Sequence, residues 1–251
     1  MTSATPATPA ERSGPGLAAS RLPHRVSGAL LALLLPAWGV SVWLAPVDRF
    51  QGVIQKVLYV HVPCAFAAYA GFALTAICGA LYLWRRDERW DRRAASAAAV
   101  GVLFCTLVLV TGPIWAKGTW GRWWSWDLRL TLTLLLYLVY LSYLLLRSFT
   151  EGSERAARFA AIYGIAGLAV IPLNYFAVDL AGGRAIHPEN LERGSLGEGM
   201  GLPFLLGVAT ALVAFAHLWL RRLEVAGLRA ERARREAEAS WTIPETVSHR
   251  E

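Results

Sequence analysis

Residues 94–146 read AASAAAVGVLFCTLVLVTGPIWAKGTWGRWWSWDLRLTLTLLLYLVYLSYLLL, with two long apolar runs on either side of a short tryptophan-rich segment. A hydrocarbon core of about 30 Å needs roughly 20 apolar residues per helix. The runs Ala94–Trp115 and Leu128–Leu146 have about that length. They therefore predict two membrane-spanning helices joined by a loop outside the bilayer core.

Four further apolar stretches of similar length lie elsewhere in the chain. The composition, 55% hydrophobic and only 17% charged, departs from that of soluble domains in the same direction. We expect an all-α integral membrane protein with six transmembrane helices. The expected spans are Val26–Val47, Val57–Trp84, Ala94–Trp115, Leu128–Leu146, Ala156–Leu180 and Leu202–Leu220.

The two ends of the chain differ from this central region in composition. Residues 1–25 are rich in Ala, Pro, Ser and Thr without an apolar run, which predicts a disordered N-terminus. The first apolar stretch is too long for the core of a signal peptide and is expected to remain as an anchor. Residues 26–222 form the expected six-helix domain. In the tail, residues 223–251, Arg and Glu alternate among alanines, which favours a solvated helix continuing from the sixth span.

The distribution of basic residues predicts the orientation. Of the 25 lysines and arginines, 18 fall on the side that carries both termini and 7 on the other. Because basic residues in short loops stay on the cytoplasmic side, both termini are expected to be cytoplasmic in a multi-pass membrane protein. The net charge of +7 is then an orientation signal, which favours contact with anionic membrane lipid and gives no reason to expect nucleic acid.

The tryptophans are concentrated in the second external loop, placed at residues 115–128. Five of the 11 lie within twelve residues, and they are Trp115, Trp120, Trp123, Trp124 and Trp126. Tryptophan is enriched at membrane–water interfaces, so an interfacial belt is one explanation. A belt needs only one or two rings per helix end, whereas a shelf of indoles at fixed spacing suits a flat apolar ligand.

Two histidines are expected on the same external side as this cluster. His61 lies just inside the outer end of the second span, and His187 lies in the third external loop. An ionisable residue near a span is a functional-site hypothesis, although His61 could also be an interfacial histidine bonded to a neighbouring helix. Imidazole is a common axial ligand of haem iron. Arg129 could pair with a haem propionate, since its guanidinium group suits carboxylates.

Other classes of site find little support. The three cysteines form no metal or redox pattern, and motifs for nucleotide or zinc hydrolysis are missing from the sequence. His24, His217 and His249 lie near the ends or on the opposite side and are not expected to be ligands.

The segment Trp120-Gly121-x-Trp123-Trp124-x-Trp126-Asp127 resembles the "WWD" signature of haem-handling membrane proteins in cytochrome c biogenesis. With the six-span layout and Tyr59-Val60-His61-Val62-Pro63, residues 26–222 resemble the haem exporter protein C family, CcmC. The resemblance implies that His61 and His187 are the axial ligands of a transiently and non-covalently bound haem b on the periplasmic face. The other candidate haem-binding residues are Trp115, Trp120, Gly121, Trp123, Trp124, Trp126, Asp127 and Arg129.

The resemblance also implies partners rather than catalysis. It implies association with the ATPase and membrane subunits of an ABC transporter and with a small single-span helper protein, and delivery of haem to a periplasmic haem chaperone. The third loop departs from the family pattern, because family members usually carry a Trp-Trp pair shortly before a Leu-His, whereas here Ala185 and Ile186 precede His187.

Two other functions remain open. A small-molecule permease is suggested by Ile171-Pro172-Leu173-Asn174 within the fifth span. A membrane haem electron-transfer subunit would need histidine pairs facing each other within the spans.

Overall fold

The computed structural model describes residues 16–149, 153–191 and 196–241. These ranges are almost entirely helical, and six of their helices are long and apolar enough to cross a membrane. The all-α class and the number of spans are therefore confirmed. Residues 1–15 and 242–251, which the sequence assigns to the disordered N-terminus and the charged tail, lie outside the described residues.

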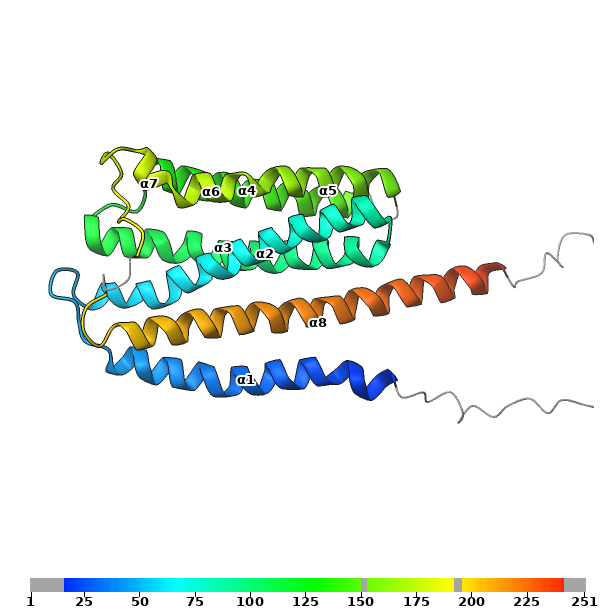
Figure 1. The fold of residues 1–251 in the computed structure, drawn as a ribbon, viewed down its shortest axis with the longest axis horizontal. Helices are drawn as coiled ribbons and strands as arrows, with labels where there is room; N and C mark the ends of the chain where they lie inside the picture. Colours follow the sequence, from blue (N-terminus) through cyan, green and yellow to red (C-terminus); the bar gives the residue numbers. More distant parts are fainter. Residues whose placement is uncertain (1–15, 150–152, 192–195, 242–251) are drawn as a thin grey trace, which may run out of the picture.

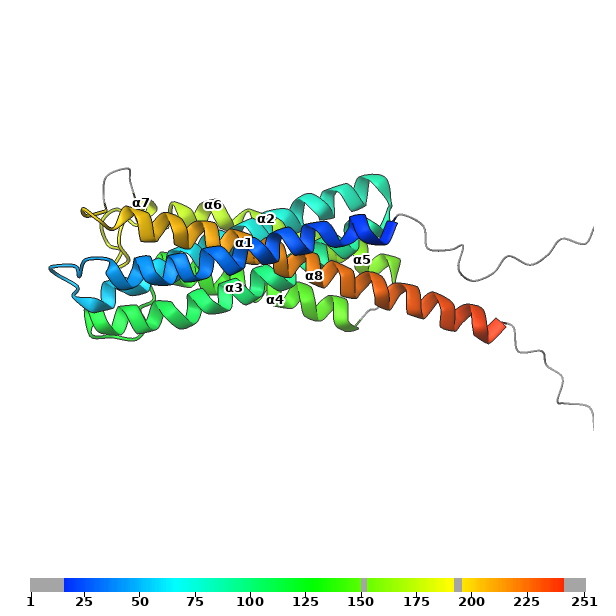
Figure 2. The same cartoon turned by 90° about the horizontal axis from the view of Figure 1, so that it is seen from below.

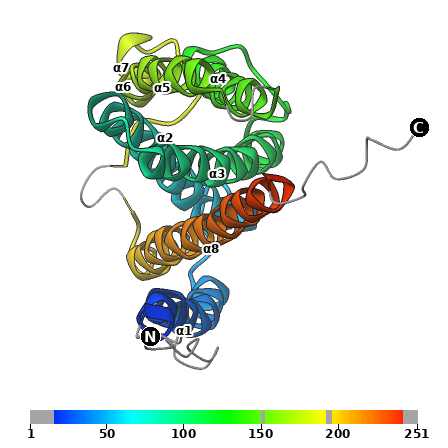
Figure 3. The ribbon, with the colours of Figure 1, turned by 90° about the vertical axis from the view of Figure 1, so that its right-hand side faces the viewer.

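The helices pack as a layered bundle. In the end-on view of Figure 3, α1 lies against α8, α8 lies against the pair α2 and α3, and that pair lies against α4 and α5. The short helices α6 and α7 continue the α5 layer. The bounds are α1 Gly16–Leu44, η2 Val53–Val57, α2 Leu58–Arg85, α3 Glu88–Trp120, α4 Leu128–Phe149, α5 Glu154–Leu168, α6 Val170–Tyr175, α7 Ala177–Leu180 and α8 Gly201–Trp241.

Helix α1 is displaced toward the N-terminus relative to the prediction. It begins at Gly16, so the expectation of disorder is wrong for residues 16–25. It ends at Leu44 rather than Val47 because Pro46 disfavours helical geometry in the residue before it. The Lys56 ammonium donates hydrogen bonds to the carbonyl of Val42 at 2.9 Å and to that of Trp43. A cation thus caps the last carbonyls of α1, where the helix dipole is negative.

Helix α3 is longer than predicted and leaves a shorter tryptophan loop. It continues to Trp120 and ends at Gly121, whose φ of 73° is the left-handed geometry in which glycine is preferred. Residues 115–120 are therefore helical, and the expected loop at 115–128 is reduced to 121–127. Trp115 and Trp120 lie on a rigid helix, whereas Trp123, Trp124 and Trp126 lie in the loop.

The fifth predicted span is interrupted. Helix α5 ends at Leu168, and the chain continues through α6 and α7 to the predicted end at Leu180. The breaks fall at Ala169, before the segment that contains Pro172, and at Phe176. Proline removes a backbone donor and so weakens the helix at this point.

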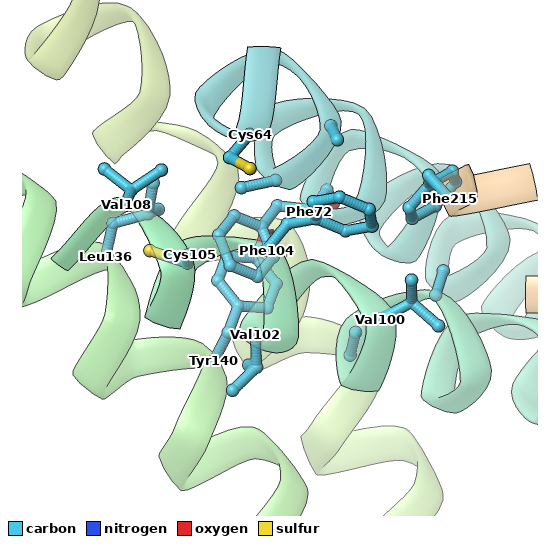
Figure 4. Packing of buried hydrophobic residues seen from close by; sticks show 14 of the residues in the cluster. Cys64, Phe72, Val100, Val102, Phe104, Cys105, Val108, Leu136, Tyr140 and Phe215 are labelled. Atoms are coloured by element: carbon cyan, nitrogen blue, oxygen red, sulfur yellow. Dashed lines mark hydrogen bonds between the residues drawn. The ribbon is translucent and has the colours of Figure 1, made fainter. Parts of the chain in front are cut away.

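The core lies where α2, α3, α4 and α8 meet (Figure 4). Phe72 and Tyr140 stack with ring centroids 3.9 Å apart, and the Tyr140 hydroxyl donates to the Gly164 carbonyl at 2.9 Å. Helices α2 and α3 approach closely at two glycines, since a Cβ on Gly71 would lie 2.8 Å from the Cα of Gly101. Small residues commonly permit such contact between membrane helices.

The bundle has two unlike ends. The start of α1 and the end of α8 lie together at one end, called here the terminal end, and α8 extends beyond the other helices there (Figures 1 and 2). This extension has ion pairs one turn apart, as between Arg232 and Glu236 at 2.7 Å, which agrees with the predicted solvated helix. The opposite end, called the loop end, carries the loops that follow α1, α3 and α7.

Candidate functional site

The second loop is fixed at both of its ends. Gly121 ends α3, and its carbonyl accepts a hydrogen bond from the Lys117 ammonium at 2.9 Å. At the other end, the Asp127 carboxylate accepts from the backbone N–H of Leu130 at 2.9 Å and so caps the first turn of α4. Two predicted site residues, Gly121 and Asp127, are thus placed at helix ends.

Asp127 also joins the second loop to the third. Its other carboxylate oxygen accepts from the backbone N–H of His187 at 3.3 Å and from the Ser125 hydroxyl at 3.4 Å. Because one carboxylate caps α4 and holds the backbone of His187, Asp127 is a positioning residue for that histidine.

His61 lies in the first turns of α2 with its ring orientation fixed by α3. Its Nδ1 is 2.9 Å from the Thr111 hydroxyl oxygen, and that hydroxyl donates its own proton to the Leu107 carbonyl at 2.7 Å. Thr111 must therefore accept from the imidazole, so the network assigns the proton to Nδ1 and leaves a lone pair on Nε2. The ring packs edge-on against Trp115 at 5.8 Å and close to Gly112, where a Cβ would lie 3.0 Å from the imidazole.

His187 has the same tautomer for a different reason. Its Nδ1 lies 2.8 Å from the Pro188 carbonyl oxygen, which can only accept, so Nδ1 carries the proton and Nε2 is unprotonated. Burial lowers the pKa of His187 from its ordinary value. The hydrogen bond to Pro188 raises this pKa in part, and the nearby Arg129 lowers it further. The neutral imidazole, which is the form that binds metals, is thereby favoured.

Arg129 projects from the first turn of α4 toward the third loop. Its guanidinium group donates to the Asn190 side-chain oxygen at 2.8 Å and to the Tyr175 carbonyl. One of its nitrogens also lies 3.4 Å from His187 Nδ1. Since that Nδ1 carries a proton, this last contact is not a hydrogen bond.

One cavity at the loop end brings six of the ten predicted site residues together. Apolar side chains of α2, α3 and α4 form its inner wall, including Phe66, Val108 and Leu136. The six are His61, Trp115, Trp120, Trp124, Arg129 and His187.

Four predicted site residues lie outside this lining. Gly121 and Asp127 stand at the helix ends, and Trp123 and Trp126 are 60% and 76% exposed. The ring of Trp126 packs edge-on against that of Trp124, with centroids 5.7 Å apart. The exposed rings agree better with an interfacial position than with burial against a ligand.

Two polar residues that the sequence did not assign to the site support it through hydrogen bonds. Asn174, 1% exposed, donates to the Arg129 carbonyl at 3.0 Å and to the Thr133 hydroxyl at 2.9 Å, and it accepts from Tyr69. Its polarity, which favoured a permease, is accounted for by these bonds. Gln51 accepts from the Trp115 indole at 2.8 Å, which ties the first loop to the site.

The chemistry of the cavity fits haem. Two buried donors among its lining residues, Trp124 Nε1 and Arg129 Nε, have no hydrogen-bond partner within the described chain, and a carboxylate would satisfy either of them. No group of three His, Cys, Asp or Glu side chains in residues 16–149, 153–191 and 196–241 could hold a metal ion. Two imidazoles beside apolar walls suit an iron whose other ligands come from a porphyrin.

Comparison with known proteins points to one family. The sequence profile of a family described as "Heme exporter protein C" matches residues 12–242. Heme exporter protein C of Bradyrhizobium diazoefficiens is 32% identical over 193 residues, which covers 76% of this chain and 72% of that protein. Heme exporter protein C of Haemophilus influenzae is 33% identical over 208 residues, with 81% of each chain covered. A ccmC-like mitochondrial protein of cytochrome c biosynthesis from Marchantia polymorpha is 36% identical over 140 residues, 56% of this chain and 59% of that one.

Proposed function

This chain belongs to the heme exporter protein C family, and from that premise we propose that it binds haem b between His61 and His187 and hands it on during cytochrome c biogenesis. The observation that carries the proposal is the lining of one cavity by two histidines, each with its proton on Nδ1. Metal-binding histidines usually donate this second N–H to a protein group.

The remaining lining residues have distinct parts in the proposal. Trp115 and Trp120 present rigid indoles from α3, and aromatic rings pack favourably on a porphyrin. Arg129 and Trp124 each retain an unpaired N–H for the propionates. The exposed rings of Trp123 and Trp126 are assigned to the membrane surface, and Asp127 positions His187.

The proposed orientation follows from the arginines. The basic residues concentrate at the terminal end, so this end is assigned to the cytoplasm and the loop end to the periplasm. Haem held at the loop end is then within reach of a periplasmic haem chaperone. Binding is transient and non-covalent, which fits an inner-membrane protein that transfers haem without bond-making chemistry.

We also propose partners for this chain on the basis of its family. The subunits of an ABC transporter and a small single-span protein would assemble with this chain in the membrane. The exposed apolar surface of α1, which includes Leu33 at 67% and Trp43 at 84%, is available either to such a helix or to lipid.

Absorption spectra of the full chain, purified in detergent, test the haem site. We expect oxidised and reduced wild-type spectra typical of haem with two histidine ligands. His61→Ala and His187→Ala should each weaken or change them. Loss of haem in His61→Ala with an unchanged spectrum in His187→Ala would place the second ligand elsewhere. A wild-type protein that neither contains haem nor binds added haem would refute the proposal.

A further inference from the structure

Two arginines at the terminal end share one indole. The guanidinium carbon of Arg93 lies 4.5 Å from the centroid of the Trp90 ring, and that of Arg85 lies 6.0 Å from the same ring. The guanidinium of Arg85 also lies 5.5 Å from the ring of Trp84. Each cation is attracted to an aromatic face, yet the two like charges repel each other because both lie close to the same ring. The pair would therefore be stabilised by an anion.

The described protein does not supply that anion. The four carboxylates nearest in the sequence and packing are already paired with other arginines, and no carboxylate among the described residues lies within ion-pair distance of Arg85 or Arg93. The pairs are Asp87 with Arg89 at 2.9 Å, Glu88 with Arg92 at 3.6 Å, Asp91 with Arg147 at 2.6 Å, and Glu154 with Arg86 at 3.6 Å and with Arg158.

The position of the cluster indicates which anion reaches it. Trp84 is 77% exposed at the end of the span formed by α2. Trp90 packs against Tyr82 and Ala157 at the start of the next layer, and the carbonyl of Arg93 accepts from the Trp219 indole at 3.2 Å. Exposed indoles at the ends of spans mark the membrane–water interface, which is the depth of lipid phosphates.

We propose that Trp84, Arg85, Trp90 and Arg93 form a binding site for the phosphate of an anionic phospholipid. The two guanidinium groups hold the phosphate, since arginine matches its geometry. The exposed ring of Trp84 contacts the apolar part of the same lipid. This site lies at the end of the bundle opposite the haem cavity and does not depend on the proposed function.

Native mass spectrometry of the detergent-solubilised full chain, titrated with phosphatidylglycerol, tests the site. The double variant R85Q/R93Q should bind this lipid about 30-fold more weakly than wild type, because each juxtamembrane arginine contributes about 1 kcal/mol. The matched control R89Q/R92Q removes the same charge from the start of α3, at the same end of the bundle, but from arginines paired with carboxylates. Its binding should change by less than about threefold, because these two arginines are already paired with carboxylates and such exposed ion pairs contribute little free energy.

Three results would overturn the proposal. Equal losses in R85Q/R93Q and R89Q/R92Q would indicate general charge attraction, and unchanged binding in R85Q/R93Q would show that the cluster holds no lipid. Displacement of phosphatidylglycerol by an equal concentration of glycerol phosphate would identify a site for free phosphate. Phosphatidylcholine of the same chain length should bind weakly to the wild type and to both double variants. If R85Q/R93Q loses helicity, the single variants replace it, and each should weaken binding about fivefold.

Discussion

Histidine and a hydroxyl form the same hydrogen-bonded pair at both ends of this bundle. His61 Nδ1 lies 2.9 Å from the Thr111 hydroxyl at the loop end, and His217 Nδ1 lies 2.8 Å from the Ser27 hydroxyl at the terminal end. In both pairs the hydroxyl donates its own proton to a carbonyl of its helix. Both imidazoles are therefore protonated on Nδ1 and keep a lone pair on Nε2.

The surroundings of the two pairs differ. His61 lines a cavity together with His187 and with two donors that have no partner among the residues that the structure describes. His217 packs between α8 and α1, where the site of a Cβ on Gly28 lies 3.7 Å from its ring. An oriented imidazole is thus common to both ends, and the imidazole at the loop end lines a cavity that the imidazole of His187 also lines. The pair at the terminal end serves to join two helices.

Removing each histidine should give the largest difference in haem affinity between the two ends. His61→Ala is expected to weaken haem binding by at least about 100-fold, because loss of an outer hydrogen-bond partner of a ligand alone costs 10- to 100-fold. His217→Ala should leave haem affinity unchanged within about twofold on the same reasoning. Haem titration of both purified variants measures this. A comparable loss in His217→Ala would show that the two ends are not functionally distinct.

Removing each hydroxyl should give a smaller difference in haem affinity between the two ends. Thr111→Val keeps the shape of the side chain and leaves the N–H of His61 without its acceptor, so haem affinity should fall by about 10- to 100-fold. Ser27→Ala should not change haem affinity, but it removes a hydrogen bond that contributes about 1 kcal/mol to stability. Haem titration and thermal unfolding separate the two effects. Normal haem affinity in Thr111→Val would mean that Thr111 does not orient the ligand.

The aspartates that cap α3 and α4 extend the comparison. Asp127 accepts from the backbone of Leu130 and Asp87 from that of Arg89, but only Asp127 also holds the backbone of His187. Asp127→Ala should lose about 1 kcal/mol of capping and, by loosening the third loop, bind haem about fivefold more weakly. Asp87→Ala should reduce the melting temperature slightly and leave haem affinity intact. Equal haem affinity in the two variants would remove the positioning role of Asp127.

The sequence predicts the spans and part of the site because both depend on local patterns. Apolar length identifies six helices, and loop order places His61, Trp124 and His187 on one side. The exact end of α3 could not be predicted, because it depends on the left-handed geometry at Gly121. That single helix end decides which tryptophans are rigid and which lie in the loop.

Long-range hydrogen bonds explain what the sequence could not indicate. Thr111 forms a hydrogen bond with His61, which lies fifty residues away in the sequence. Asn190, in the third loop, accepts a hydrogen bond from Arg129 at the start of α4. Neither contact leaves a periodic or spaced signal. Asn174 did stand out, as a polar residue within a span, but its interpretation required its partners in α2 and α4.

The pH dependence of stability should give the smallest effect and concerns the loop end alone. Burial lowers the pKa of His187 below its ordinary value of about 6.5, so the unfolded chain takes up a proton first as the pH falls. The contribution of neutral His187 is therefore complete above about pH 6.5 and is lost as the pH falls toward the lower, folded-state pKa. The slope for one proton is at most about 1.4 kcal/mol per pH unit. Thermal unfolding of the haem-free protein between about pH 7.5 and 5 should thus decline more steeply for wild type than for His187→Gln. Parallel curves would mean that the third loop does not bury this imidazole, and the tautomer on which the loop-end comparison depends would no longer be supported.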